Sequence, residues 1–520
     1  ATSGGNQLTL TSGNLLSTAA GQTIGNVSLV GLSSAPVLNF GAVEGGLLVD
    51  TGADLTVNAA LAGSTNMTKG LSGNLTFATK QFFNSGASYF TINGGTVTLA
   101  GGENTLWQGA QGGTSGQHLA IGPGATLNLG ANAQMVGQIK SPNGTALAAT
   151  GGVITGTGTL INADTQGTTG VWGGSIQGTG LYYNKAGSTG ATFYSDNTYT
   201  GGTLITGGTL TLIDEGKLSG TSSVELAYGA LTLNNGGTAN VADRLANAAA
   251  ITSRGGALVL AGRDSTNVTE TVGALTLERG LTNLSVQPAA NGVVRSVVLS
   301  VGNLTRNNDS TLLYYGNTTG TSNGQMGSHG RIIIANGTSF LVNNIIPWAS
   351  DGIEFASYVA PSAGNLSGGL GNLNQPGYAG YDATIVPAGS GVATQNLRLP
   401  SASFVIPDVS AGSAGSYLAN SIVFVSSANN QSLTFADSAN DTLNLTSGGL
   451  SIGGNFTGKT IGAGRITTGG TQSSGVAPLF LLVNQGSVSF GASIVDNGLG
   501  ATTRLVYSGL NDAPTSLIAA

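Results

Sequence analysis

The chain has 520 residues, of which 7% are charged, 40% are hydrophobic and 87 are glycine, and its formal net charge is −6. This composition fits neither a disordered chain, which combines few apolar residues with high net charge, nor collagen, which needs glycine at every third position. The scattered basic residues form no patch for nucleic acid or for a membrane surface, and no apolar run reaches the roughly 20 residues of a spanning helix.

Cysteine is absent, so disulfides and thiol chemistry play no part. No signal peptide precedes Ala1, and we therefore expect either that an export signal has been removed or that the chain is a segment of a longer one.

Short segments in which apolar and polar residues alternate recur through the first third of the chain. Such alternation predicts β-strands, because successive side chains of a strand point to opposite faces. Most of the segments are followed closely by Gly or Asn, which favour turns. The strands predicted in this way are Gln7–Leu10, Asn26–Leu29, Val37–Phe40, Leu47–Val49, Asp54–Val57, Asn74–Phe77, Tyr89–Ile92, Thr96–Leu99, His118–Ile121 and Thr126–Leu129.

Glycine-rich sequence continues from Gly151 to Asp196, where Trp172 and the Tyr182–Tyr183 pair are the large residues expected to fill the interior. Helical periodicity is almost absent. The one helical turn predicted is Val241–Ala250 (VADRLANAAA), with an aspartate near its N-terminus.

The most regular stretch is Asn197–Leu212, with the sequence NTYTGGTLITGGTLTL. It contains two predicted strands, Thr203–Thr206 and Thr209–Leu212, and each follows a Gly-Gly pair. We expect Leu204 and the two leucines of the second strand to lie on one buried face. Glycine pairs favour sharp corners, because a positive φ costs glycine little. Strands joined by such corners predict a chain that winds into a parallel β-solenoid.

Asn197–Leu212 resembles the autotransporter-associated β-strand repeat of passenger-type proteins on bacterial surfaces. The resemblance continues through Arg244–Leu260 and Glu270–Leu277, and Ile345–Tyr358 is similar to a segment that follows such repeats in very large passenger-like chains. The resemblance implies a right-handed β-helix. It also implies a role in surface display, adhesion or cell–cell contact, outside the cell or at a bacterial cell surface.

The pattern changes between residues 304 and 400, where prolines interrupt it and remove donors from any strand ladder. Tyr358, Tyr378 and Tyr381 are expected to add aromatic surface there. The sequence thus predicts an all-β fold in three parts. They are a right-handed parallel β-solenoid over residues 1–303, an irregular loop or small β excursion over 304–400, and a continued solenoid over 401–520. The interrupting prolines are Pro347, Pro361, Pro376, Pro387 and Pro400.

Carboxylates are the strongest candidates for chemistry, because β-helix folds also host polysaccharide lyases and hydrolases with several acids in a sugar-binding cleft. Asp351 and Glu354 lie near Trp348, whose indole suits stacking on a sugar ring. These three residues are the candidate carbohydrate contacts. Glu44, Asp50 and Asp54 form a second candidate group of carboxylates, whereas Asp214 and Glu215 are interpreted as an exposed corner. Solvated turn carboxylates are the alternative interpretation for every one of these groups.

Other motifs are weaker. His118 and His329 stand alone, without metal-ligand spacing. The G-x-S-x-G matches at Gly320–Gly324 and Gly449–Gly453 lack the strand-to-helix setting of a hydrolase nucleophile.

Calcium is the one metal considered. Asp437–Asp441 and Asn307–Asp309 offer oxygen ligands, although neither has EF-hand or nonapeptide spacing. The alternative for both segments is an Asx turn at a strand end. The sequence therefore predicts no catalytic residue, no cofactor and no metal ligand beyond this candidate calcium.

These observations favour a non-enzymatic extracellular β-solenoid, a structural or adhesive rod used for display, cell–cell contact or filament formation. The alternative is a polysaccharide-acting β-helix enzyme, a lyase or a hydrolase. End coils that lack caps expose strand edges. The expected partners are therefore other copies of the chain or flanking solenoid segments placed end to end, with surface glycans or other cells as further partners.

Overall fold

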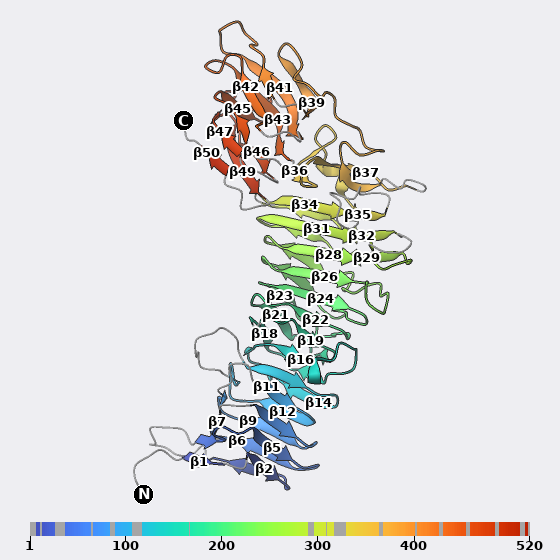
Figure 1. The fold of residues 1–520 in the computed structure, drawn as a ribbon, viewed down its shortest axis with the longest axis vertical. Coiled ribbons are helices and arrows are strands. Elements are labelled where there is room, and N and C mark those ends of the chain that lie inside the picture. The colour runs from blue at the N-terminus through green and yellow to red at the C-terminus, as the bar shows by residue number, and fades with distance from the viewer. Residues whose placement is uncertain are drawn as a thin grey trace. The chain divides into compact units, whose positions relative to one another are not determined.

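The structure is a computed structural model. It describes residues 7–10, 13–25, 37–63, 66–83, 89–106, 117–165, 167–289, 296–307, 309–316, 329–362, 368–400, 403–425, 430–453, 458–483, 488–509 and 515–517. Within these ranges the chain is almost wholly β, with two short 3₁₀ turns, η1 (Pro142–Gly144) and η2 (Gly337–Phe340). The strands wind into a parallel β-solenoid of about 16 turns, which confirms the predicted fold class (Figure 1).

Two compact units make up the chain, Ala1–Ala274 and Leu275–Ala520. The segment predicted to be an excursion, residues 304–400, lies inside the second unit. None of the helices in the described part of the chain has the length and apolar character needed to cross a membrane.

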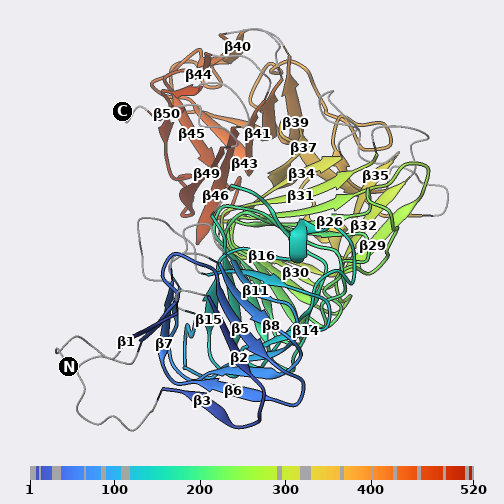
Figure 2. The same ribbon diagram turned by 60° about the horizontal axis from the view of Figure 1, so that its bottom comes forward.

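In the early coils of the first unit, each turn contributes strands to three faces (Figure 2). All the pairs described on these faces are parallel. One face holds β1 (Gln7–Thr9), β4 (Val37–Asn39), β7 (Ala60–Gly63) and β10 (Phe82–Phe83). The second holds β2 (Asn14–Ser17), β5 (Gly45–Val49), β8 (Met67–Gly70), β11 (Tyr89–Ile92), β13 (His118–Ile121) and β16 (Ile139–Lys140). The third holds β3 (Gln22–Ile24), β6 (Asp54–Val57), β9 (Asn74–Phe77), β12 (Gly95–Leu99), β14 (Ala125–Asn128), β17 (Val153–Thr155) and β20 (Ser175–Ile176).

The later coils of this unit build two further parallel ladders and add β29 (Val268–Val272). The first ladder is β15 (Gln134–Val136), β18 (Thr159–Ala163), β21 (Tyr182–Ala186), β23 (Thr203–Ile205), β25 (Ser223–Leu226) and β27 (Ala250–Ser253). The second ladder is β19 (Gly170–Trp172), β22 (Ala191–Phe193), β24 (Thr209–Ile213), β26 (Ala230–Asn234) and β28 (Ala257–Ala261).

The strands predicted in the first third coincide with observed strands to within a residue or two at each end, and Asn26–Leu29 lies outside the described residues. Local alternation was sufficient to predict these strands, because each strand needs only that the side chains on its inward face be apolar. Trp172 and Tyr183 are fully buried, as expected of fillers, whereas Tyr182 is only partly buried.

Identical apolar side chains stack from coil to coil. Leu210, Leu231 and Leu258 occupy matching positions of β24, β26 and β28 and are fully buried. Each such side chain contributes about 1.5–3 kcal/mol through burial. A second stack is formed in the same way by Leu212, Leu233 and Leu260.

The prediction that Leu204 shares the buried face is wrong. In β23, Thr203 and Ile205 point inward, and Leu204 faces outward and is only partly buried. The reason is Tyr199, which is fully buried and whose hydroxyl lies 2.6 Å from the Thr203 hydroxyl. The Thr203 hydroxyl in turn lies 2.9 Å from that of Thr221 on the next coil. A polar chain inside the solenoid therefore sets the register of this strand.

The predicted helical turn at Val241–Ala250 is also wrong. No helix forms there, and Leu245 instead makes a parallel bridge to Leu218 on the preceding coil. The backbone carbonyl of Arg244 accepts a hydrogen bond from Leu218 N at 2.8 Å, so the segment is part of a rung. Tertiary pairing has overridden the helix propensity of the alanines.

The Gly-Gly pairs of the signature stretch are needed mainly for close approach of neighbouring coils. Only Gly208 of these four glycines has a positive φ, +61°. A Cβ at Gly201 would lie 2.1 Å from the Leu181 carbonyl oxygen, and one at Gly207 would lie 2.7 Å from the Gly187 oxygen. Backbones of adjacent coils therefore touch at the corners.

Replacing Gly201 by alanine is expected to lower the free energy of unfolding by about 3 kcal/mol, because the methyl group would displace the backbone of the neighbouring coil. Gly180→Ala is the matched control, since a Cβ there has nothing within 4 Å and only the φ of +77° is strained. The control should cost about 1 kcal/mol. Urea unfolding followed by far-UV circular dichroism measures both, and equal losses would contradict the close-approach explanation.

The second unit begins with parallel rungs and then departs from them. Two antiparallel pairs, β36–β37 and β37–β38, follow the parallel pairs β31–β34 and β34–β36. The strands of this part are β30 (Leu275–Leu277), β31 (Leu281–Gln287), β32 (Val297–Val301), β33 (Leu304–Arg306), β34 (Thr311–Gly316), β35 (Gly330–Ile334), β36 (Ile346–Ser350), β37 (Phe355–Val359) and β38 (Gly369–Asn372).

Tyr358 does not add aromatic surface, contrary to expectation. It is 6% exposed, and its hydroxyl donates to Ile334 O at 2.7 Å and accepts from Ile334 N at 3.1 Å. Tyr378 and Tyr381 are partly buried. The aromatic residues of this region therefore belong mainly to its packing.

Parallel pairing resumes after residue 390, around a buried apolar cluster that includes Leu397, Tyr417, Leu443 and Ile466. One sheet contains β39 (Gly391–Leu399), β41 (Ser416–Phe424), β43 (Thr442–Ile452), β45 (Arg465–Thr468) and β48 (Ser493–Ile494). In the same sheet, β46 (Val476–Val483) pairs with β43, and β49 (Thr502–Gly509) pairs with β46. The other contains β40 (Ser403–Ile406), β42 (Ser432–Phe435), β44 (Lys459–Ile461), β47 (Val488–Phe490) and β50 (Thr515–Leu517).

Candidate functional site

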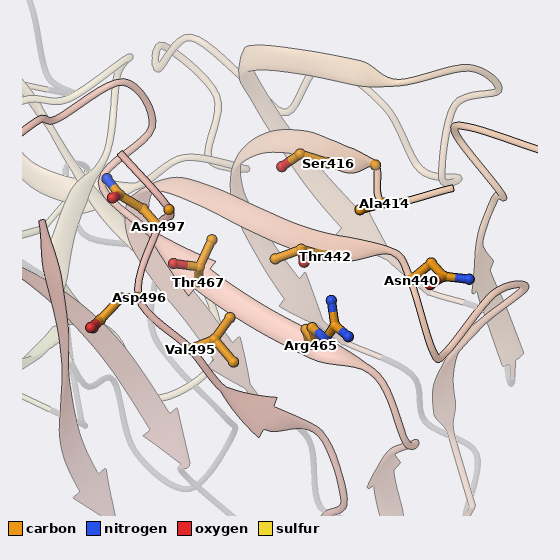
Figure 3. Close-up of a pocket in the computed structure, with 11 residues that line it drawn as sticks. Ala414, Ser416, Asn440, Thr442, Arg465, Thr467, Val495, Asp496 and Asn497 are labelled. Carbon is orange, nitrogen blue, oxygen red and sulfur yellow. The ribbon is translucent and has the colours of Figure 1, made fainter. Parts of the chain in front are cut away.

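A groove of about 500 Å³ lies on the outward face of β41, β43 and β45 in the second unit (Figure 3). Ser416, Thr442 and Arg465 stand at matching positions of the three strands, and the side chains that follow them in sequence point into the apolar cluster. The lining residues are Ala414, Gly415, Ser416, Asn440, Thr442, Arg465, Thr467, Val495, Asp496, Asn497 and Gly498.

The two ends of the groove differ in charge. Figure 3 shows Arg465 and Asn440 toward one end and Asp496 and Asn497 toward the other, with Thr442 between them. The loop that carries residues 495–498 follows β48 and forms one wall. The groove therefore presents a cation and a carboxylate on either side of a hydroxyl-lined floor.

Several of these groups are held in place by bonds to the protein. Arg465 Nη2 donates to Ala439 O at 2.6 Å, and Asp496 Oδ1 accepts from Thr503 N at 2.8 Å. Asn497 is held by three hydrogen bonds: its Nδ2 donates to Gln472 O at 2.6 Å, and its Oδ1 accepts two backbone N–H groups. Arg465 is thus held at one end of the groove, and Asp496 and Asn497 are held at the other.

Trp348, proposed from the sequence as a sugar-stacking residue, is 6% exposed. The Phe340 ring meets it edge-on at 5.5 Å between centroids, and the Arg306 guanidinium lies 5.4 Å from its ring. The indole is therefore packed inside the second unit and is not open for stacking on a sugar ring.

Asp351 and Glu354, the other two candidates, are brought together with an arginine but are buried, at 7% and 5% exposure. Arg398 donates to Glu354 Oε1 from Nε at 2.9 Å and from Nη2 at 2.8 Å. Asp351 Oδ1 accepts from the backbone N–H groups of Ile353 and Glu354, and its Oδ2 accepts from Asn372 Nδ2 at 2.8 Å. The Asp351 carboxylate therefore stabilises its own turn, and Glu354 forms an ion pair with Arg398.

Burial dominates the electrostatics of this cluster. It raises the pKa of Glu354 above its ordinary value, although the charge of Arg398 opposes the rise. It likewise raises the pKa of Asp351, against the hydrogen bonds that this carboxylate accepts. The pKa of the Tyr381 hydroxyl, which interacts with Glu354, is raised well above its usual range by burial and by that carboxylate.

Four of the remaining acidic residues, Glu44, Asp50, Asp54 and Asp214, accept hydrogen bonds within the chain, whereas Glu215 is exposed. Glu44 accepts from the Thr68 hydroxyl, and Asp54 accepts from Asn74 Nδ2 at 2.9 Å. Asp214 was expected at an exposed corner, but it is 9% exposed and accepts from both the backbone N–H and the hydroxyl of Thr238. These hydrogen bonds connect the turn at Asp214 to the next coil.

His118 is 2% exposed, and its Nδ1 accepts from Gln138 N at 2.7 Å while Tyr89 packs beside the ring. Burial lowers the pKa of His118, so the neutral ring is favoured. His329 lies in a turn. Of the two serine motifs, Gly320–Gly324 lies outside the described residues, and Gly449–Gly453 runs through the end of β43.

The segments considered for calcium are engaged with the chain itself. The Asp437 carboxylate accepts from Ala439 N, Asn440 N and Asn440 Nδ2, which is an Asx turn. Asp309 pairs with Arg504. Within the part of the chain that the structure describes, no group of three or more His, Cys, Asp or Glu side chains comes together to hold a metal ion.

Arg244 of the first unit is fully inaccessible to solvent. Its guanidinium donates to Asn235 Oδ1 from Nε and Nη2, at 3.2 and 2.9 Å, and to Gly216 O from Nη1 at 2.7 Å. Glu270, 1% exposed, accepts the backbone N–H groups of Arg244 and Leu245, each at 3.1 Å. This network joins three coils.

Stability of the first unit is expected to fall as pH rises because of Glu270. Burial raises the pKa of this carboxyl from 4.5 to about 7, despite the two N–H groups it accepts. The native state therefore binds the proton more tightly than the unfolded state does. The stabilisation is complete below pH 4.5 and is lost as pH rises through about 7.

Urea unfolding at a series of pH values checks this expectation. The parent should lose on the order of 3 kcal/mol relative to Glu270→Gln between these two pH limits. Glu225→Gln, which removes a partly exposed partner of Arg254, is the control. Parallel pH profiles for the parent and Glu270→Gln would contradict the assignment.

Apart from Asn440, which lies in the candidate calcium segment Asp437–Asp441, the groove residues were not predicted from the sequence, although part of the signal is present. Alternation in DTLNLT and RITT places Thr442, Arg465 and Thr467 on one face. The lengths of the coils decide whether β43 and β45 lie in register. They also decide whether residues 495–498 fold beside these two strands. No local pattern encodes this.

Comparison of the chain with protein-family models, with curated proteins and with solved structures found no match.

Proposed function

We propose that the chain is a non-enzymatic structural or adhesive element of a bacterial cell surface, whose solenoid coils serve display, cell–cell contact or filament assembly. The observation that carries the proposal is the repetition of the coil. In the first unit β21, β23, β25 and β27 pair in succession, all parallel, and the buried leucines stack from coil to coil. Stability in such a stack is a sum of nearest-neighbour contacts, so coils can be added for reach.

The composition supports an extracellular setting. Only 7% of residues are charged, and Ser, Thr, Asn and Gly take over the outer faces, as in the outward Thr211 and Thr232 of β24 and β26. The resemblance of Asn197–Leu212 to a passenger-type repeat points the same way. The proposed partners are other copies of the chain or flanking solenoid segments, together with surface glycans or other cells.

The polysaccharide-acting enzyme, the alternative from the sequence, requires several carboxylates open to a polymer. Asp351 and Glu354 meet Arg398, but at 7% and 5% exposure they are closed to a polymer. The groove on β41, β43 and β45 is lined by a single carboxylate, that of Asp496. No specific observation therefore favours the enzyme over the adhesive element.

Beads coated with the purified protein test the proposal. They are expected to cluster with one another or to retain bacterial cells more than beads coated with an unrelated β-rich protein. Electron microscopy of concentrated protein would reveal end-to-end assemblies. Release of unsaturated or shortened oligosaccharides from acidic polysaccharides would overturn the non-enzymatic assignment, as would beads that neither cluster nor retain cells in a sample that forms no assemblies.

A further inference from the structure

We propose that the groove on β41, β43 and β45 binds an oligosaccharide that carries carboxylates, such as a uronic-acid oligomer. The proposal rests on the adhesive function proposed above and names the partner of that function. Its basis is the pairing of one positioned guanidinium with a floor of hydroxyl groups in a groove of about 500 Å³, within the size range of small-molecule sites.

Arg465 supplies the charge recognition. Its single side-chain hydrogen bond among the described residues, from Nη2 to Ala439 O, orients the guanidinium and leaves Nε, Nη1 and the second Nη2 proton to donate to a ligand. The charge of the nearby Asp437 interacts with that of Arg465, but among the described residues its carboxylate accepts hydrogen bonds from its own turn and not from the guanidinium. A guanidinium held in this way matches the planar geometry of a carboxylate.

The groups on the floor and at the far end suit the hydroxyls of a sugar. Within the described part of the chain, the hydroxyls of Ser416 and Thr442 have no hydrogen-bond partner, and Asp496 uses only Oδ1. A hydroxyl both donates and accepts, and a carboxylate oxygen accepts. A ligand that places its carboxylate on Arg465 therefore meets hydrogen-bonding groups for its hydroxyls along the floor and at Asp496.

A peptide carboxylate is a poorer fit for this position. Strand β43 pairs with β41 on one side and with β45 on the other, so its backbone groups are already used in the ladder. A peptide cannot add a strand here, and it would have to bind through side chains alone. No aromatic or large aliphatic pocket lines the groove to anchor such side chains.

Isothermal titration calorimetry of the full chain with a galacturonate oligomer tests the proposal at low ionic strength. Saturable binding is expected, weakened at least tenfold by Arg465→Gln and about threefold by Thr442→Val, since hydrogen bonds to charged groups are the stronger ones. Arg279→Gln, an exposed arginine elsewhere in the second unit, is the control and should bind like the parent. Thermal unfolding verifies that the variants remain folded.

Three results would overturn the proposal: no saturable binding, equal affinity of Arg465→Gln and the parent, or equal affinity for the neutral galactose oligomer of the same length. Oligoglutamate binding as tightly as galacturonate would overturn the saccharide assignment. Chromatography of the same mixtures, which detects cleavage of the oligomer, distinguishes failure of the proposed function from failure of the proposed site. If a bound oligomer is cleaved, the non-enzymatic function is refuted and the site is not. If no oligomer binds but coated beads still cluster, the site alone is refuted.

Discussion

Replacing Arg244 by alanine is expected to lower the free energy of unfolding of the first unit by about 3–5 kcal/mol. The substitution removes a fully buried side chain, leaves Gly216 O without its side-chain donor, and leaves Asn235 Oδ1 with the Val241 N–H alone. Lost packing and the loss of these buried hydrogen bonds both contribute to the lower stability. Urea unfolding monitored by circular dichroism measures it.

The matched control is Arg254→Ala in the same unit. Arg254 pairs with Glu225 at the surface, where the two side chains are 33% and 29% exposed, and such pairs contribute about 0–1 kcal/mol. Equal losses for the two arginines would show that the Arg244 network adds nothing beyond a surface charge. Arg244→Met, which restores most of the volume without the donors, should fall between the two.

Removing the charge of Arg398 is expected to destabilise the second unit by about 3 kcal/mol at neutral pH. Arg398→Met leaves Glu354, at 5% exposure, as a buried carboxylate without its ion-pair partner. An uncompensated buried charge is more costly than the absence of the whole pair. The loss should shrink at low pH, because burial already raises the pKa of Glu354 and the missing cation would raise it further.

The double variant Arg398→Met with Glu354→Gln tests this explanation. It should recover most of the stability lost in the single variant, with a coupling free energy above about 1 kcal/mol in a double-mutant cycle. Arg504→Met is the control, because the Arg504–Asp309 pair is 50% and 36% exposed. Additive losses would mean that Glu354 and Arg398 act independently and that the cluster is not an ion pair in solution.

The coil-forming pattern could be predicted because it is local. Strands such as Asp54–Val57 and Asn74–Phe77 appear where the sequence alternates, since a strand requires only that every second side chain be apolar. The glycine pairs were predicted correctly as corners, but the reason was incomplete. Gly201 is required because the Leu181 carbonyl lies against it, and that contact joins two coils.

The candidate site illustrates the opposite case. Trp348, Asp351 and Glu354 are close in sequence and chemically suited to sugars, but the fold buries all three. Glu354 is covered because Arg398, 44 residues further along the chain, pairs with it.

The sequence by itself therefore determined the class of fold, a stack of short parallel strands, because alternation and glycine corners act over a few residues. The tertiary structure alone decided which side of β23 faces inward, which carboxylates are buried and where a polar groove opens between Arg465 and Asp496. Those outcomes depend on contacts between successive coils, whose lengths vary, and no local pattern specifies which residues such coils bring together.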